Sequence, residues 1–301
     1  MTKPVKILSI ALGALAVVVL AAAATVYVAS QRVITAKLAI PAEAIPIPTD
    51  SLSLAKGKHF VGPISKCVDC HGEDLGGQTV VDAAPMGRWG GRNLTRGAGG
   101  IGAQLTDDDW IRAIRHGVGR DGHKLVLMPS EAYNALSPED LGAIIAYAKQ
   151  VPPVDRVMPP ITFGPVARAL LAVNKIPLFM ADQIDHTKPA VAAPMPGPNA
   201  SYGGYLAHVG GCAGCHGPTF AGGKIAQGDP SWPPAANLTP TGLKLYTEES
   251  FARTLRTGVR PSGVALNPAM PWKQAGQMTD DEIRAVWEYL RTLPPREFGA
   301  R

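Results

Sequence analysis

Two short cysteine motifs are the residues whose types and spacing could do chemistry together. The four cysteines form two pairs, each followed directly by a histidine: Cys67, Cys70 and His71, then Cys212, Cys215 and His216. Two thiols at this spacing can form thioether bonds with the two vinyl groups of a haem, and the next histidine can bind the iron from one side. The sequence therefore predicts two covalently bound haem c groups, with His71 and His216 as proximal iron ligands.

Paired cysteines also occur in zinc sites, structural disulfides and thioredoxin-like redox centres. None of these explains a histidine directly after both pairs, since only 7 of the 301 residues are histidine. A zinc site would also need four ligands from one cluster, whereas Cys67 and Cys212 lie 145 positions apart. Haem attachment accounts for all six residues.

The second half of the chain repeats the first with a shift of 141 to 145 residues. Besides the cysteine motifs, Asn93-Leu94-Thr95 falls on Asn237-Leu238-Thr239, and Met128-Pro129 falls on Met270-Pro271. The motifs follow in the same order in both copies. The repeat predicts two tandem domains, residues 51–153 and 199–301, each near the commonest domain size.

The sequence of each copy predicts helices joined by long loops, because it has no convincing run of alternating β-branched residues. A double proline ends an amphipathic helix in both copies, at Pro152-Pro153 and Pro294-Pro295. The predicted helix N-caps are Thr106, Ser137, Thr247 and Thr279, the last forming a capping box with Glu282. The predicted fold class is all-α.

The second axial ligand of each iron is predicted to be a methionine, Met128 and Met270. Both precede proline, which cannot continue a helix, so a loop can aim the thioether at the iron. Met180 and Met278 are expected to be core filler. Methionines without a repeat counterpart are secondary candidates: Met86, Met158 and Met195.

The remaining histidines do not recur in the repeat and are expected to be surface or structural residues: His59, His116, His123, His186 and His208. Of these, His123 is the nearest competitor for iron, five residues before Met128. The Asn-Leu-Thr triplets have the form of glycosylation acceptors, but a loop role near the haem is the preferred interpretation. Trp89 and Trp232, just upstream, would either line the haem or simply pack.

An apolar segment runs from Ile7 to Ala29, long enough to cross a bilayer, and Lys3 and Lys6 precede it. By the positive-inside rule the N-terminus stays in the cytoplasm and the rest is exported. We expect an uncleaved anchor over residues 1–30 followed by a linker over residues 31–50, rather than a signal peptide, whose apolar core is usually shorter.

Residues 154–198 form a proline-rich linker with one apolar patch, expected to pack along a domain face; a surface for a partner or a membrane is the alternative. The net charge of +5 is modest, and no basic run lies outside the N-terminal region. A nucleic-acid partner is therefore not expected.

With these motifs, the chain resembles the class I, mitochondrial-like cytochrome c fold and, as a tandem, the membrane-bound dihaem cytochromes c of bacteria. It is also similar to the cytochrome subunits of bacterial alcohol and gluconate dehydrogenases, which commonly carry three haem motifs where this chain has two. The sequence motifs on which this resemblance rests are Gly57-Lys58-His59-Phe60, Gly204-Tyr205-Leu206, the Asn-Leu-Thr loops and Ala269-Met270-Pro271-Trp272.

The resemblance implies single-electron transfer from a dehydrogenase or quinol-oxidising complex to a terminal oxidase or another cytochrome. It also implies a bacterial inner-membrane location with the haem domains in the periplasm. The alternative is a dihaem enzyme of the peroxidase or thiosulfate dehydrogenase kind, in which one iron is open. Such a site should break the symmetry of the repeat, so we expect an electron-transfer protein without catalytic residues.

Overall fold

The computed structural model describes residues 2–41, 43–225, 228–229 and 231–300, so the outermost residues of the predicted segments, 1 and 301, lie outside it. The α-helices are α1 (Lys3–Ile34), α2 (Ser51–His59), α3 (Val68–His71), α4 (Asp107–His116), α5 (Ser130–Tyr133), α6 (Pro138–Gln150), α7 (Pro165–Ala172), α8 (Ala200–Val209), α9 (Cys212–His216), α10 (Glu248–Thr257), α11 (Trp272–Ala275) and α12 (Asp280–Thr292). The other elements are the π-helix η1 (Phe60–Ile64), the 3-10 helices η2 (Gly102–Gln104) and η3 (Met180–Gln183), and the strands β1 (Gln78–Ala83), β2 (Gly87–Gly91) and β3 (Thr162–Phe163).

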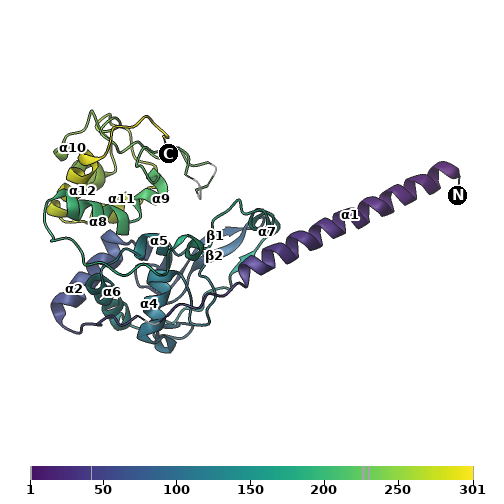
Figure 1. Ribbon diagram of the computed structural model, residues 1–301, viewed down its shortest axis with the longest axis horizontal. Coiled ribbons are helices and arrows are strands. Elements are labelled where there is room, and N and C mark those ends of the chain that lie inside the picture. Colours follow the sequence, from purple (N-terminus) through teal and green to yellow (C-terminus); the bar gives the residue numbers. More distant parts are fainter. Residues whose placement is uncertain (1, 42, 226–227, 230, 301) are drawn as a thin grey trace.

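Two helical lobes and one long projecting helix make up the molecule (Figure 1). The first lobe contains α2 to α6, and the second contains α8 to α12. One continuous hydrophobic core extends through both lobes, from Phe60 and Ile145 in the first to Leu206 and Ile283 in the second. The predicted helical fold, with a long apolar helix at the N-terminus, is confirmed.

Side-chain caps begin the longer helices of both domains. As predicted, the side chains of Thr106, Ser137, Thr247 and Thr279 accept a backbone N–H of the first turn. Thr279 and Glu282 form the predicted capping box. Two further boxes use Asp109 and Ser250 as the third helical residue, in place of the usual Glu or Gln. The last helix of each domain ends next to its double proline, as expected.

A glycine brings the first and last helices of each domain into backbone contact. A Cβ on Gly57 of α2 would lie 2.0 Å from the carbonyl oxygen of Ala143 in α6. A Cβ on Gly203 of α8 would lie 1.8 Å from the carbonyl oxygen of Ala285 in α12. Only glycine allows this approach, so Gly57 and Gly203 occupy equivalent places in the two domains.

A small antiparallel sheet in the first domain was not expected from the sequence. The strand order is β1, β2, β3, with a register shift between Thr79 and Val81. Strand β2 is mostly glycine, a residue that weakens isolated strands, which is why local preference gave no signal. Pairing with β1 and β3 and the burial of Trp89 stabilise it.

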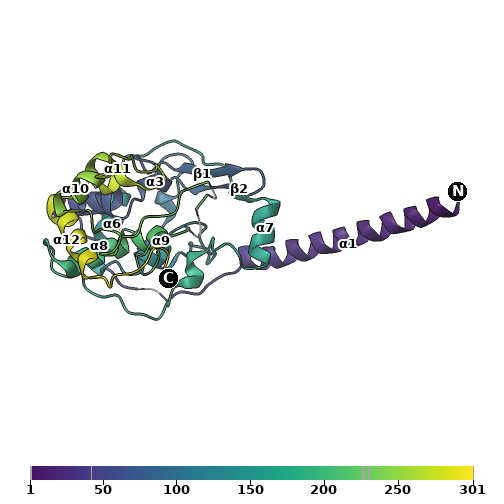
Figure 2. The same cartoon turned by 90° about the horizontal axis from the view of Figure 1, so that it is seen from above.

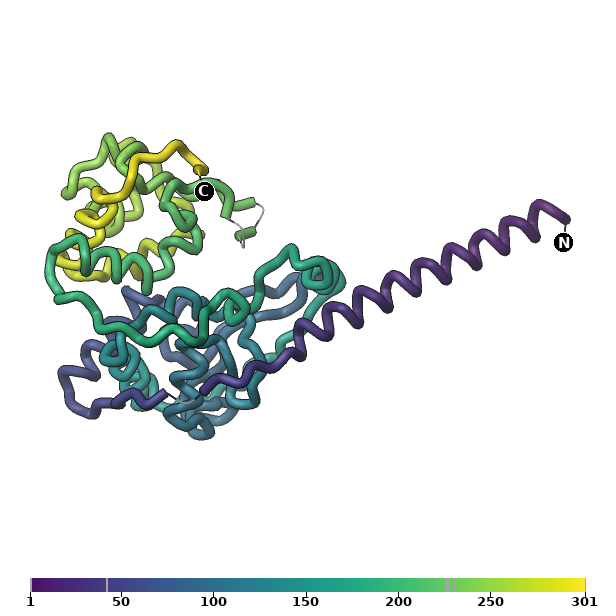
Figure 3. Tube along the Cα trace, in the orientation of Figure 1, coloured from purple at the N-terminus to yellow at the C-terminus, as the bar shows by residue number. Residues whose placement is uncertain are grey.

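The segment between the domains is built onto the first domain. Strand β3 completes the sheet, and α7 packs Ala167 and Leu171 into a second, smaller core with Trp89 and Phe179. Val33 and Ile34, at the end of α1, pack against the same core. Beyond α7 the chain runs back between the two domains before it enters α8 (Figure 3).

Two reciprocal contacts join the domains. His59, two residues after Gly57, lies across the boundary from Glu282, with 2.8 Å between its Nε2 and a carboxylate oxygen. Tyr205, two residues after Gly203, donates its hydroxyl hydrogen to Asp140 of the first domain. Asp140 and Glu282 are each the third residue of the last helix in their domain. Each domain therefore offers the same two sites to the other, with different side chains.

We predict that Gly57→Ala and Gly203→Ala each lower the free energy of unfolding by about 1–3 kcal/mol, the usual cost of overpacking. The clashing atom is a backbone oxygen, which cannot rotate away. Chemical denaturation measures the change. Gly62→Ala is the matched control, because its Cβ would meet no atom within 4 Å. Equal stability of all three variants would contradict the close helix crossing.

We also predict that the contact between His59 and Glu282 contributes about 1 kcal/mol of coupling in a double-mutant cycle of His59→Ala and Glu282→Gln. Burial raises the pKa of Glu282, but hydrogen bonds from His59 and Thr279 outweigh it, so the net shift is below the ordinary 4.5. The stabilisation is therefore present above about pH 4.5 and lost as the pH falls through the lowered value.

Thermal unfolding from pH 3 to 7 measures this dependence, and Glu282→Gln should flatten it. Asp281→Asn is the control, because this substitution at an exposed neighbouring residue also removes a negative charge from the first turn of α12. If Asp281→Asn flattened the profile as much, the helix dipole rather than the domain contact would account for it.

Candidate functional site

The histidine of each cysteine motif has one ring nitrogen fixed by the backbone. His71, at the end of α3, donates from Nδ1 to the carbonyl oxygen of Arg92 (2.9 Å). His216, at the end of α9, donates from Nδ1 to the carbonyl oxygen of Ala236 (2.8 Å). A bond that occupies Nδ1 selects the tautomer in which Nε2 carries the free lone pair that binds iron. Both histidines thus leave Nε2 available, as a proximal ligand would require.

The Asn-Leu-Thr loops position these two carbonyl groups. Asn93 follows Arg92 directly, and its side chain donates to the carbonyl oxygen of Val154 (2.7 Å) and accepts from Thr95. Asn237 follows Ala236 and donates in the same way to the carbonyl oxygen of Arg296 (2.8 Å). The loops therefore connect each histidine to the segment that follows its domain's last helix. Asn93 is fully buried, so this triplet is not a glycosylation acceptor.

The four thiols are unpaired and half-buried. Burial raises the pKa of Cys67 to about 12, and it also raises the pKa values of Cys70 and Cys215. A neutral thiol is a weak nucleophile, so this environment does not favour thioredoxin-like reactivity. Among the described residues, no three or more His, Cys, Asp or Glu side chains gather as a metal site. The donor set instead suits a haem held by two thioethers and one imidazole.

The two predicted methionines lie in turns of the same conformation. Pro129 has φ −80° and ψ 53°, and Pro271 has φ −78° and ψ 55°. A backbone N–H two residues after each methionine donates to its carbonyl oxygen, at 2.8 Å for Met128 and 2.7 Å for Met270. Both side chains are partly buried against the main core. The backbone turns that carry the two methionines are therefore equivalent.

Helix α5 connects the first methionine loop to the first cysteine motif. The hydroxyl group of Tyr133 donates to the carbonyl oxygen of Ser65, two residues before Cys67. Burial raises the pKa of Tyr133 well above its usual range, so the donor stays neutral. The segment after Met128 is therefore held against the segment just before Cys67.

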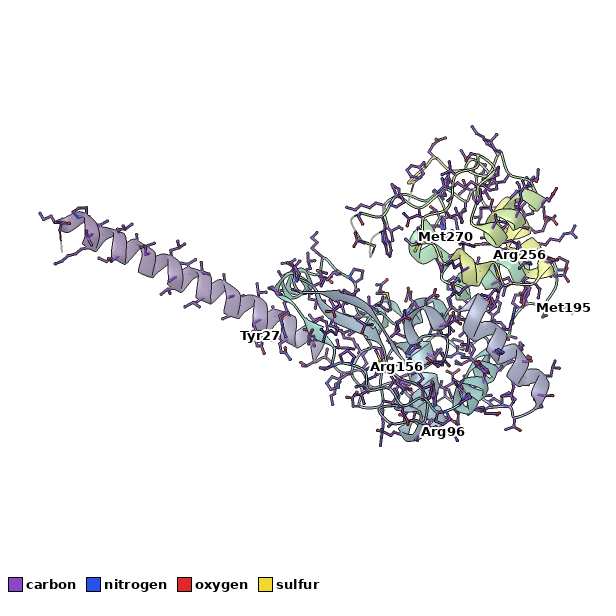
Figure 4. The ribbon with its side chains drawn as sticks, turned by 180° about the vertical axis from the view of Figure 1, so that it is seen from behind. Tyr27, Arg96, Arg156, Met195, Arg256 and Met270 are labelled. Carbon is purple, nitrogen blue, oxygen red and sulfur yellow. The ribbon has the colours of Figure 1, made fainter. Side chains whose placement is uncertain are left out.

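Two arginines at equivalent positions of the repeat, Arg115 and Arg256, support the loops that follow the methionines, a role that the sequence analysis did not predict. Arg115 of α4 donates to the carbonyl oxygens of Asn134 (3.0 Å) and Leu136 (2.9 Å), just after α5. Arg256 of α10 donates to the equivalent carbonyls of Gly276 and Met278, and it lies in the second domain with Met270 (Figure 4). The signal available in the sequence was an arginine at the same helix position in both copies.

Lys66 joins the two cysteine motifs across the domain boundary. It directly precedes Cys67 and adopts a positive φ of 52°. Its Nζ donates to the carbonyl oxygen of its own Ile64 (2.9 Å) and to that of Gly210 (2.8 Å), two residues before Cys212. The N-terminal sides of the two motifs thus lie next to each other.

The other candidate residues are buried in the core, contact neighbouring side chains or are exposed. Met180 and Met278 are buried, as predicted, whereas Met195 is 84% exposed. His116 contacts His186 (3.0 Å), and His123 pairs with Asp121 (2.8 Å). Trp89 donates to the carbonyl oxygen of Thr162 (2.8 Å), which is a packing role, and Trp232 is largely exposed.

Comparison with known families matches each domain separately. Residues 54–147 match the family described as cytochrome c oxidase, cbb3-type, subunit III. Residues 201–294 match the family described as cytochrome c. Together the two matches cover the helices and loops that hold both cysteine motifs.

Similar proteins are cytochrome subunits of bacterial dehydrogenases. The fructose dehydrogenase cytochrome subunit of Gluconobacter japonicus is 35% identical over 103 residues, 32% of this chain and 21% of that protein. The alcohol dehydrogenase (quinone) cytochrome c subunit of Gluconacetobacter polyoxogenes is 29% identical over 276 residues, 82% of this chain and 57% of that protein. The gluconate 2-dehydrogenase cytochrome c subunit of Pantoea cypripedii is 34% identical over 95 residues, 29% of this chain and 22% of that protein.

This chain therefore covers no more than 57% of the length of these relatives. The similarity to the alcohol dehydrogenase subunit nevertheless extends through both domains. Cytochrome c domains carry covalently attached haem c, which agrees with the half-buried thiols and the fixed imidazoles. The chain is thus a tandem of two cytochrome c domains preceded by an apolar helix, similar to the cytochrome c subunits of bacterial dehydrogenases.

Proposed function

We propose that the chain is a dihaem c-type cytochrome that passes single electrons from a periplasmic-side dehydrogenase or quinol-oxidising donor to a downstream cytochrome or terminal oxidase. The observation that carries the proposal is the duplicated site: in each domain, one imidazole bound at Nδ1 to a loop carbonyl and one methionine in the same proline turn. This equivalence supports two carriers rather than one carrier and one open catalytic centre.

In this proposal, each domain attaches one haem through its two cysteines and binds the iron with its histidine and its methionine: Cys67, Cys70, His71 and Met128; Cys212, Cys215, His216 and Met270. The bound haem supplies a one-electron Fe(III)/Fe(II) couple. The carbonyl oxygens of Arg92 and Ala236 hold the imidazoles in one orientation, and the arginine-supported loops hold the thioethers. Such fixed ligands limit the rearrangement that accompanies each electron.

Electrons would pass between the two domains inside the molecule. Lys66 brings the beginning of the first cysteine motif next to Gly210, at the beginning of the second. The continuous core and the reciprocal contacts of His59 and Tyr205 keep the domains in this arrangement. The interface therefore supports electron transfer between the two haems of one molecule rather than two carriers that act independently.

The apolar helix α1 would remain as a membrane anchor. Its 32 residues reach about 48 Å at 1.5 Å per residue, more than the ~30 Å of a bilayer core. Arg168 of α7 lies over the ring of Tyr27 (4.6 Å) and donates to Ser30 (3.1 Å). Cleavage near Ala29 would remove the first of these contacts, so they support retention of the helix and an inner-membrane location with both domains in the periplasm.

The central test is the haem content of the protein made in a bacterium that matures c-type cytochromes. A pyridine haemochrome assay should give two haems per chain. The paired changes Cys67→Ala with Cys70→Ala, and Cys212→Ala with Cys215→Ala, should each leave one. A wild-type value of zero or one would contradict the proposal.

We predict that Met128→Leu and Met270→Leu each convert one haem from low spin to high spin and lower its potential by on the order of 100 mV. Leucine keeps the volume of the side chain but provides no ligand. Electron paramagnetic resonance and a redox titration measure both changes. Met195→Leu is the control, because Met195 is exposed. A wild-type high-spin centre that reacts with peroxide would instead support the dihaem enzyme.

A gene deletion would identify the donor. Because the similar proteins are subunits of alcohol, fructose and gluconate dehydrogenases, these three compounds are the first substrates to test for substrate-dependent oxygen uptake. Loss of uptake with one of them, restored by the wild-type gene but not by the His71→Ala variant, would link the chain to that dehydrogenase. Uptake unchanged with every substrate would favour another donor.

A further inference from the structure

Helix α7 meets α1 where the apolar helix leaves the proposed membrane. The last turns of α1 pack against α7 through Val33 and Ile34, and Tyr27 lies at the base of the projecting helix (Figure 4). Figures 1 and 2 together show α7 running across the direction of α1. If α1 spans a bilayer, α7 therefore lies along the membrane surface.

Helix α7 carries an exposed apolar stripe. Val166 and Val173 of the α7 region are 44% and 61% exposed, although both are aliphatic. Ala169 lies between them at helical spacing and is also exposed. The opposite stripe of α7, Ala167 and Leu171, is buried against the first domain. The helix thus has one apolar stripe in the protein core and another one uncovered.

The turn between β1 and β2 extends this surface. Ala83, Ala84 and Pro85 are exposed, and the carbonyl oxygen of Pro85 accepts from the N–H of Val166 (2.9 Å). We name the apolar surface patch by its six residues: Ala83, Ala84, Pro85, Val166, Ala169 and Val173. In both views the two domains lie behind α7 when seen from the free end of α1 (Figures 1 and 2).

Two exposed cationic side chains lie close in sequence to the junction of α1 and α7. Arg32, in the last turn of α1, and Lys175, after α7, are exposed. Asp82, the acidic residue next to the turn, is paired with Arg88 (3.0 Å). Apolar side chains flanked by exposed cations suit the boundary between acyl chains and phosphate headgroups. A tyrosine at the end of the span, here Tyr27, suits the same boundary.

We propose that the apolar surface patch inserts into the outer surface of the bilayer that α1 spans. This inference rests on the proposed membrane anchoring of α1. The patch and the helix would together give the first domain two attachments to the membrane, which fixes its orientation. The domain would then be held against the membrane rather than tethered by a free helix, and the first cysteine motif would stay at a constant height above the lipid.

Photo-cross-linking to lipid tests the proposal on the full, haem-loaded chain. The photoreactive amino acid p-benzoylphenylalanine would replace Val166 or Val173, and the protein would be placed in vesicles of phosphatidylethanolamine and phosphatidylglycerol. Mass spectrometry would measure the lipid adducts. The same replacement at Val264, which is 57% exposed in the second domain, is the matched control. The same replacement at Leu15 reports on α1, and the haem content of each variant reports on folding.

The expected result is lipid adduct at positions 166 and 173 several-fold above that at 264, together with strong labelling at 15. Labelling at 15 with only control-level adduct at 166 and 173 would overturn the patch and leave the anchor standing. No labelling at 15 would overturn the anchor and this inference together. Adducts at 166 or 173 to a second copy, or to another protein in native membranes, would show that a protein covers the patch and would also overturn the proposal.

Discussion

The hydrogen bond from each motif histidine to a loop carbonyl is the contact on which both sites depend. It fixes which ring nitrogen is free, and it needs the carbonyl of Arg92 or Ala236 to stay in one place. That carbonyl is held because the next residue, Asn93 or Asn237, is bonded to the segment after the last helix. A short motif therefore acquires its geometry from residues about 20 and about 80 positions further along the chain, and the same is true in both domains.

The two domains are duplicates that have become complementary. Equivalent positions carry histidine and glutamate in one contact, and tyrosine and aspartate in the other. Different pairs at equivalent places favour the association of the first domain with the second over that of either domain with itself. Lys66 adds a contact across the interface that the second domain does not repeat, since Gly211 lies where Lys66 would fall. The interface is therefore specific to this tandem.

The region between the domains does more than connect them. It supplies β3, α7 and part of a second core, and this core receives the end of α1. The first domain is in this way joined rigidly to the apolar helix, whereas the second contacts the first through its own helices. A fixed helix exit is what gives the uncovered stripe of α7 a defined direction.

The sequence by itself determined the chemistry: cysteine spacing, adjacent histidines and the internal repeat indicate haem attachment, and caps and double prolines give the main helices, because these signals are local. Tertiary structure decided what depends on contacts between distant residues. The glycine-rich strand β2 forms only when β1 and β3 pair with it, and Arg115 has a role only where the loop beyond α5 returns to α4. The bridge from Lys66 to Gly210 likewise arises from the packing of one domain against the other, which no local pattern encodes.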